Sequence, residues 1–219
     1  MLDDPTARDL IAAALGKTID RAVREHIGGI TQEAPLTARI GQMLEIELNG
    51  KDILGNHIRI ITQDIPDRGR GALEKDIGAD LYVGVEVSGP GRRRKTKGFL
   101  VQAKLRDKLS GTSDEKLLRD SCKRLSGITE ASYVFIYGPS GVGVINATKL
   151  VEDSRTRPRD MKTRRVTTLL KKTLECSEGD VDLGLPNNRR AGRTRRALSD
   201  RLKGLKVERA VEVIIESSL

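Results

Sequence analysis

Asp80, Gln102 and Lys104 are side chains whose types and spacing suggest chemistry. Asp80 precedes an apolar run with aliphatic residues at every second position, and Gln102 and Lys104 end a second apolar run that begins at Phe99. Side chains two residues apart on a strand point to the same face of a sheet, so Gln102 and Lys104 can serve one site. A carboxylate on one strand, with an amide and a lysine on the next, suits a divalent cation held beside a water molecule.

The pattern of Asp80, a variable gap and residues 102–104 (Gln-Ala-Lys) at the end of an apolar strand resembles the PD-(D/E)xK nuclease superfamily, as a QxK variant. Gln102 stands where that superfamily usually has Asp or Glu, and Ala79 stands where it has Pro. The resemblance covers about residues 31–151. It implies an α/β, restriction-endonuclease-like fold, in which helices flank a mixed β-sheet. It also implies metal-dependent hydrolysis of phosphodiester bonds, most often in DNA.

The same resemblance implies a role for each of four catalytic residues. Glu33, Asp80 and Gln102 would bind Mg²⁺, for which Mn²⁺ can substitute, and Lys104 would orient the attacking water and stabilise charge on the phosphate. Simpler interpretations exist for two of them. An Asp at the start of a strand commonly forms a turn, and a lysine at the end of a strand can extend its ammonium into solvent.

The helical carboxylate has two candidates in the helix expected over residues 31–48, with Thr31 as its cap. Glu33 and Glu47 both fall on the apolar face of this helix, whereas Glu45 points away from it. The superfamily supplies its carboxylate from near the start of the first helix, so Glu33 is preferred and Glu47 is the alternative. Glu33 can also be explained by the positive N-terminal end of the helix dipole alone.

Composition excludes several other classes of protein. The 219 residues are 37% apolar, which is enough for one core, and they contain no apolar run that spans a bilayer. Cys122 and Cys176 lack metal-binding spacing, and His26 and His57 are too few for a zinc centre. The acidic start of the chain does not resemble a signal peptide, which favours a cytoplasmic protein without membrane contact.

Charge is divided unevenly along the chain. Residues 1–91 contain 10 basic and 15 acidic side chains, whereas residues 92–219 contain 30 and 16. A basic half favours a polyanionic partner, and five aromatic residues are too few for recognition of single strands by base stacking. Duplex DNA is therefore the expected partner, although such charges can also form a solvated surface. The candidate nucleic-acid-binding residues are Arg92, Arg93 and Arg94 at an expected hairpin tip, and Arg193, Arg195 and Arg196.

Three segments are expected: an N-terminal helix within residues 1–30, a nuclease core at 31–154, and a basic extension at 155–219 that packs on the core. Periodicity and turn residues indicate the individual elements. They predict helices near residues 5–26, 31–48, 114–125, 166–174 and 195–205, and strands near 57–61, 81–87, 99–104, 132–137, 142–145 and 209–215.

Two functions from different classes fit these features. The first is an Mg²⁺-dependent endonuclease, as a homo-oligomer or with a partner protein. The second is a non-catalytic DNA-binding or assembly protein on a degenerate nuclease scaffold, which Gln102 and the absent Pro would favour. An RNA-processing or nucleotide-modifying enzyme ranks last, because the sequence has no aromatic platform, Walker sequence or zinc spacing.

Overall fold

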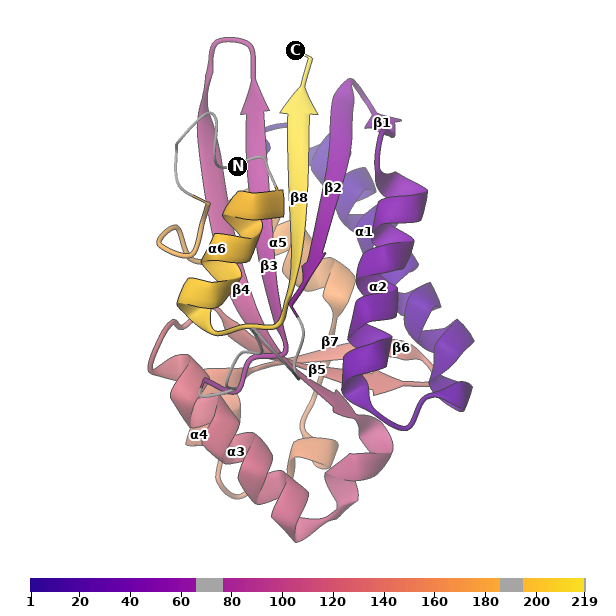
Figure 1. The fold of residues 1–219 in the computed structure, drawn as a ribbon, viewed down its shortest axis with the longest axis vertical. Helices are drawn as coiled ribbons and strands as arrows, with labels where there is room; N and C mark the ends of the chain where they lie inside the picture. Colours follow the sequence, from indigo (N-terminus) through magenta and orange to yellow (C-terminus); the bar gives the residue numbers. More distant parts are fainter. Residues whose placement is uncertain (66–76, 186–194, 219) are drawn as a thin grey trace.

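The computed structural model describes residues 1–65, 77–185 and 195–218, with the side chains of Arg92, Arg195 and Ala197 excepted. The described residues form one mixed eight-stranded sheet (Figure 1). Across the sheet, the strands follow the order β1 (Asp52–Ile53), β2 (Asn56–Asp64), β8 (Arg209–Ser217), β3 (Leu81–Gly89), β4 (Arg92–Leu105), β5 (Ser132–Gly138), β6 (Gly141–Asn146) and β7 (Arg164–Arg165).

Helices cover both faces of this sheet, which confirms the expected α/β class. The helices are α1 (Pro5–His26), α2 (Glu33–Leu48), α3 (Thr112–Ser126), α4 (Ala147–Glu152), α5 (Val166–Glu175) and α6 (Arg195–Leu205), with short 3-10 turns η1 (Ile27–Gly29), η2 (Arg106–Ser110) and η3 (Pro158–Asp160). One apolar cluster joins α1, α2 and α5 to the sheet. On the other face, α6 and the pair α3–α4 each cover a separate cluster. Within the described ranges, no helix is long and apolar enough to cross a membrane.

Local sequence signals position the first two helices. Asp4 caps α1, because its Oδ1 accepts hydrogen bonds from the backbone N–H of Thr6 (2.8 Å) and Ala7 (3.3 Å), and Pro5 occupies the first helical position as expected. The second helix begins later than predicted. Its cap is Gln32, whose side chain makes no capping bond, so Thr31 does not cap it and Glu33 becomes its first residue.

The basic stretch at residues 92–97 is a strand and not a hairpin tip. Strand β4 pairs with β3 from Arg92 onward, and the turn is confined to Pro90 and Gly91, whose φ of 68° favours glycine. Charged residues are uncommon in central strands, but Lys97 gains partners there. Its Nζ donates to three backbone carbonyl oxygens, those of Cys176 (2.9 Å), Glu178 (3.1 Å) and Gly179 (3.1 Å). Tertiary contacts therefore outweigh the low strand propensity of this stretch.

The C-terminal segment completes the sheet. Strand β8 lies between β2, to which it is antiparallel, and β3, to which it is parallel. The extension expected at residues 155–219 thus contributes an interior strand, and the boundary at residue 154 does not divide the sheet. The apolar run of β8 is buried on both faces, as a central strand requires. Periodicity identified this strand, but it carries no information about which strands are its neighbours.

Candidate active site

Asp80 lies at the point where β3 begins and β4 continues without it. The first residue of β3 pairs with Val101, so the backbone N–H groups of β4 beyond Val101 that face the β3 side, and not β5, need other acceptors. Asp80 supplies one of them: its Oδ2 accepts a hydrogen bond from the N–H of Ala103 (2.8 Å) and another from Nε2 of Gln102. The carboxylate predicted from the sequence and the amide of Gln102 are therefore in direct contact.

Glu33 supplies the next acceptor along the same strand edge. Its Oε1 accepts from the N–H of Leu105 (3.2 Å), and its Oε2 accepts from Nζ of Lys108 (3.3 Å). Burial acts to raise the pKa of the Glu33 carboxyl, but backbone hydrogen bonds and the charges of Lys104 and Lys108 together hold this pKa below its ordinary value. Glu33 is therefore ionised at neutral pH.

Lys104 completes this group. It is half-buried, and Gln102, on the same face of β4, is 8% exposed. Lys104 lies close enough to Glu33 to lower the pKa of that carboxyl, yet it forms no ion pair with any residue that the structure describes. The structure therefore brings Glu33, Asp80, Gln102 and Lys104 to one end of β4, from three separate segments of the chain.

Tyr137 and Thr37 form the floor between the two carboxylates. The Tyr137 hydroxyl lies 2.9 Å from Oγ1 of Thr37, and both side chains are buried. Burial raises the pKa of Tyr137, and the charges of Asp80 and Glu33 raise it further, so the phenol keeps its proton. The sequence alone does not indicate this pair, because Thr37 and Tyr137 are 100 residues apart and meet only in the folded protein.

A cavity of about 460 Å³ lies beside this group, against α2 and the ends of β2 and β8. Asp64 and Arg209 line it, and Nε of Arg209 is 3.6 Å from Oδ1 of Asp64. Burial raises the pKa of Asp64, although the charge of Arg209 opposes that effect. The sequence could not indicate this pair, because the two residues meet only through the pairing of β2 with β8.

Other carboxylates considered from the sequence lie elsewhere. Glu47 pairs with Arg21 and accepts a hydrogen bond from Thr18 (2.9 Å), both on α1, and fourteen residues of helix place it about 21 Å from Glu33. Of the two helical candidates, only Glu33 reaches β4. Glu45 does not point away from the sheet as expected. It accepts a hydrogen bond from Thr62 of β2 and lines the cavity beside Asp64.

The candidate nucleic-acid-binding arginines also separate into groups. Nη2 of Arg94 donates to the buried Oε2 of Glu86 (2.6 Å). Arg94 therefore lies within the sheet, and it is not at an exposed hairpin tip, where the sequence pattern places it. Arg93 and Arg196 are exposed. Arg193 and the side chains of Arg92 and Arg195 lie outside the described residues.

The residues at the end of β4 carry the types of oxygen ligand that Mg²⁺ prefers. No group of three or more His, Cys, Asp or Glu side chains gathers in the described ranges, but Mg²⁺ commonly uses one or two carboxylates together with waters and substrate phosphate. Asp80, the Ala103 carbonyl and Gln102 would supply oxygen ligands after a half-turn of the Gln102 carboxamide, whose Nε2 now donates to Asp80 and to Ala103 O (3.2 Å).

The spacing of these ligands limits what Glu33 can do. The two N–H groups that hold Asp80 and Glu33 are two residues apart on β4, which corresponds to about 6.7 Å. Two oxygens bound to one Mg²⁺ lie at most about 4 Å apart, since each Mg–O distance is about 2.1 Å. The N–H groups that hold Asp80 and Glu33 are therefore farther apart than two ligands of one ion. Glu33 would act through a water molecule or hold a second ion.

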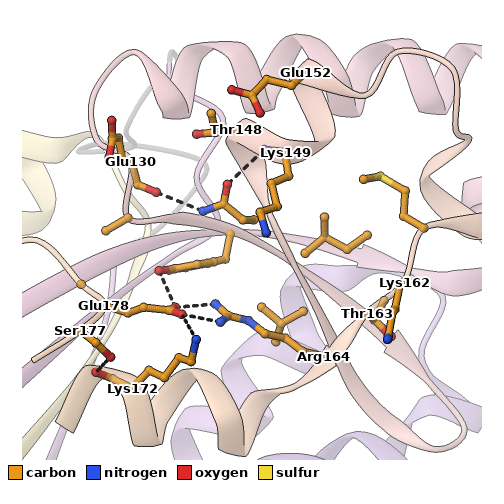
Figure 2. Close-up of a pocket in the computed structure, with 17 residues that line it drawn as sticks. Glu130, Thr148, Lys149, Glu152, Lys162, Thr163, Arg164, Lys172, Ser177 and Glu178 are labelled. Carbon is orange, nitrogen blue, oxygen red and sulfur yellow. Dashed lines mark hydrogen bonds and ion pairs between the residues drawn. The ribbon is translucent and has the colours of Figure 1, made fainter. Parts of the chain in front are cut away.

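A second cavity, of about 710 Å³, is lined by residues at the start of β5 and the end of β6, among others (Figure 2). Glu178 is at the centre of its charged cluster: it forms a two-pronged ion pair with Arg164, accepts from the Tyr133 hydroxyl (2.9 Å), and lies 3.6 Å from Nζ of Lys172. Arg164 also lies over the Tyr133 ring, 5.5 Å from its centre. These charges satisfy one another, so this cluster stabilises the wall of the cavity.

Comparisons of the chain with family models, with curated proteins and with solved structures found no match.

Proposed function

We propose that this protein is a metal-dependent endonuclease that hydrolyses phosphodiester bonds, with DNA as its substrate. The observation that carries this proposal is the meeting of Asp80, Gln102, Lys104 and Glu33 at the end of β4. It joins two carboxylates, an amide and a lysine without an ion-pair partner in the described part of the chain. These groups could hold a divalent cation and stabilise charge on a phosphate, which are two contributions to metal-assisted phosphodiester hydrolysis.

The order of elements supports the proposal. Along the chain, α2, β2, β3, β4, α3 and β5 follow one another, with Asp80 at the start of β3 and the Gln-Ala-Lys segment at the end of β4. This order agrees with the restriction-endonuclease-like arrangement that the sequence pattern implies. Strand β8 would then be an addition to that arrangement, between β2 and β3.

Each residue of the group has a chemical role in this proposal. A bound Mg²⁺ would lower the pKa of a water and neutralise charge on the phosphate. Asp80 and the Ala103 carbonyl would hold the ion, and Lys104 would donate hydrogen bonds to the attacking water and to a phosphate oxygen. The protonated Tyr137 hydroxyl, which is paired with Thr37, lies close enough to Asp80 and Glu33 for both charges to raise its pKa, and it would support the packing between them.

The experiment that tests the proposal is plasmid cleavage. Purified protein is incubated with supercoiled plasmid and with linear duplex in Mg²⁺, in Mn²⁺ and in EDTA. The wild type is compared with Asp80→Asn and with Glu47→Gln, a carboxylate of α2 that faces α1. We expect metal-dependent cleavage by the wild type and by Glu47→Gln, and its loss in Asp80→Asn. Cleavage that persists in Asp80→Asn at the wild-type rate would overturn the site.

One observation favours a second function, a DNA-binding scaffold without catalysis. The amide nitrogen of Gln102 donates to Asp80, and this contact holds β3 and β4 together without a metal. A protein of this kind would bind duplex DNA equally well in EDTA and in Mg²⁺, as measured by a gel mobility shift, and it would cut no substrate in either condition. The plasmid experiment therefore separates the two functions directly.

A further inference from the structure

A groove of about 640 Å³ runs between α1 and the strands β6 and β7, which lie beside each other in Figure 1. The residues of α1 that line it are Ala13, Lys17, Asp20 and Arg24, which recur at the spacing of one helical face. The opposite face of α1 packs into the core.

The groove is strongly cationic. Its lining includes the basic side chains Lys17, Arg24, Arg106, Arg164 and Arg165. Arg164 is paired with Glu178, but the other four are exposed and form no ion pair with any described residue. Asp20 is the carboxylate that lines the groove, and its Oδ1 accepts the N–H of Val142 (2.8 Å). Like charges in one concavity repel each other, so an anionic occupant would stabilise this arrangement.

Arg106 lines the groove and is also the residue of the groove that lies nearest along the chain to the candidate active site. This residue directly follows Leu105, whose N–H binds Glu33. Its guanidinium packs against Gly138, where a Cβ would lie 3.1 Å from Nε of Arg106, and Gly138 is the neighbour of Tyr137. A chain of phosphates that passes the end of β4 would therefore meet Arg106 first and then the cations of α1 and β7.

We propose that this groove binds the sugar-phosphate backbone of the duplex DNA that the candidate active site cuts, and the inference rests on that proposed function. Lys17 and Arg24 are seven residues apart, about 10.5 Å along the helix. This distance corresponds to about three nucleotide steps of one strand of B-DNA. No aromatic side chain lines the groove within the described ranges, so stacking with single-stranded bases is not favoured.

The test is the affinity of the full-length protein for a fluorescently labelled 20-base-pair duplex, measured by anisotropy in EDTA over a series of salt concentrations. The groove variant Lys17→Glu/Arg24→Glu/Arg165→Glu is compared with the control Lys51→Glu/Lys116→Glu/Lys203→Glu, which changes the net charge equally at exposed positions elsewhere. We expect the groove variant to lose at least tenfold in affinity and the slope of log K against log salt to fall by about 3. The control should change affinity less than threefold.

Equal losses in the two variants, or wild-type binding by the groove variant, would overturn the groove as the binding site. Circular dichroism and thermal unfolding of both variants identify any loss that is due to unfolding. Tighter binding to anionic lipid vesicles than to the duplex would also contradict the inference.

The outcomes separate the groove from the chemistry. If the groove variant loses binding while no protein cuts DNA in any metal, the groove stands and the nuclease proposal fails. If the wild type cuts plasmid, Asp80→Asn does not, and the groove variant binds and cuts like the wild type, the nuclease proposal stands and the groove fails.

Discussion

Two pairs of carboxylates, one at the end of β4 and one inside the sheet, have opposite environments. Asp80 and Glu33, at the end of β4, each accept a backbone N–H that β3 leaves unpaired. Glu86 of β3 and Glu212 of β8 lie in the sheet interior, 0% and 1% exposed. In the region that the structure describes, neither oxygen of Glu212 has a hydrogen-bond partner. Burial alone therefore does not decide whether a carboxylate keeps its charge.

The neighbours of each pair decide its charge. Burial raises the pKa of Glu212 well above its ordinary value, and the charge of Glu86 raises it further, whereas Arg94 and Arg201 oppose the shift. Glu212 is held in this place by close packing, since a Cβ on Gly84 would collide with its carboxylate. The pKa of Glu33 is lowered instead. Glu33 therefore keeps its charge at a place where a cation could be bound, whereas burial favours the protonated form of Glu212.

The largest effect is expected from Lys104→Ala at the charged end of β4. Removal of one transition-state donor commonly costs about a hundredfold in rate, so cleavage should fall by about that factor while thermal stability changes little. Cleavage of labelled duplex under single-turnover conditions measures this effect. Lys108→Ala, which removes another cation near Glu33, is the control and should lose much less. Equal losses in the two variants would mean that only local charge matters.

The second effect concerns the buried pair. Arg94→Ala leaves Glu86 in the interior without its 2.6 Å partner, and breaking a buried pair in this way commonly costs about 3–5 kcal/mol. Urea unfolding measures the loss in the free energy of unfolding. Arg93→Ala, at the neighbouring exposed position, should change that energy by less than about 0.5 kcal/mol. A similar small change for Arg94→Ala would show that Glu86 does not depend on this arginine.

The third prediction is a pH dependence. Because the folded pKa of Glu212 lies above its ordinary value of 4.5, the folded state retains a proton that the unfolded state releases. The wild type should therefore lose stability as the pH rises above about 4.5, by up to about 1.4 kcal/mol per pH unit, until the folded pKa is passed. Glu212→Gln removes this titrating group. The free energy of unfolding of the variant, relative to that of the wild type, should therefore increase as the pH rises. A difference that is equal at pH 5 and pH 8 would contradict the shift.

The smallest effect is expected at the floor of the candidate site. Tyr137→Phe removes the hydrogen bond to Thr37 and should cost about 1 kcal/mol of stability. A double-mutant cycle with Thr37→Val measures the coupling between the two side chains, because the single variant Thr37→Val also accounts for the hydrogen bond that Oγ1 of Thr37 donates to the Glu33 carbonyl (3.0 Å). Additive losses would show that the two groups act independently. The same variants, assayed for cleavage, would report whether the floor also positions the carboxylates.

Local patterns predicted most of the elements correctly, and the reason differs between them. Helix α1 begins at Pro5 and ends at His26 as expected, because Asp4 and the apolar spacing act over neighbouring residues. The six polar, mostly charged residues at 92–97 are typical of a loop. This stretch is a strand because its charged side chains find partners in the folded protein. Lys97 donates to the carbonyl of Glu178, 81 residues away, and Arg94 pairs with Glu86 on the neighbouring strand. No local sequence pattern contains these contacts.

The sequence by itself determined that Asp80 and the Gln-Ala-Lys segment lie together, because a short hairpin brings adjacent strands into register over few residues. It did not determine which carboxylate of α2 joins them, since Glu33 and Glu47 share one helical face. Only the tertiary structure decided that, by placing the start of α2 against β4 and its end against α1. The cavity beside Asp64 and the cationic groove along α1 likewise exist only after β8, β6 and β7 are in place. Contacts between distant segments depend on packing in three dimensions, which residue spacing along the chain does not encode.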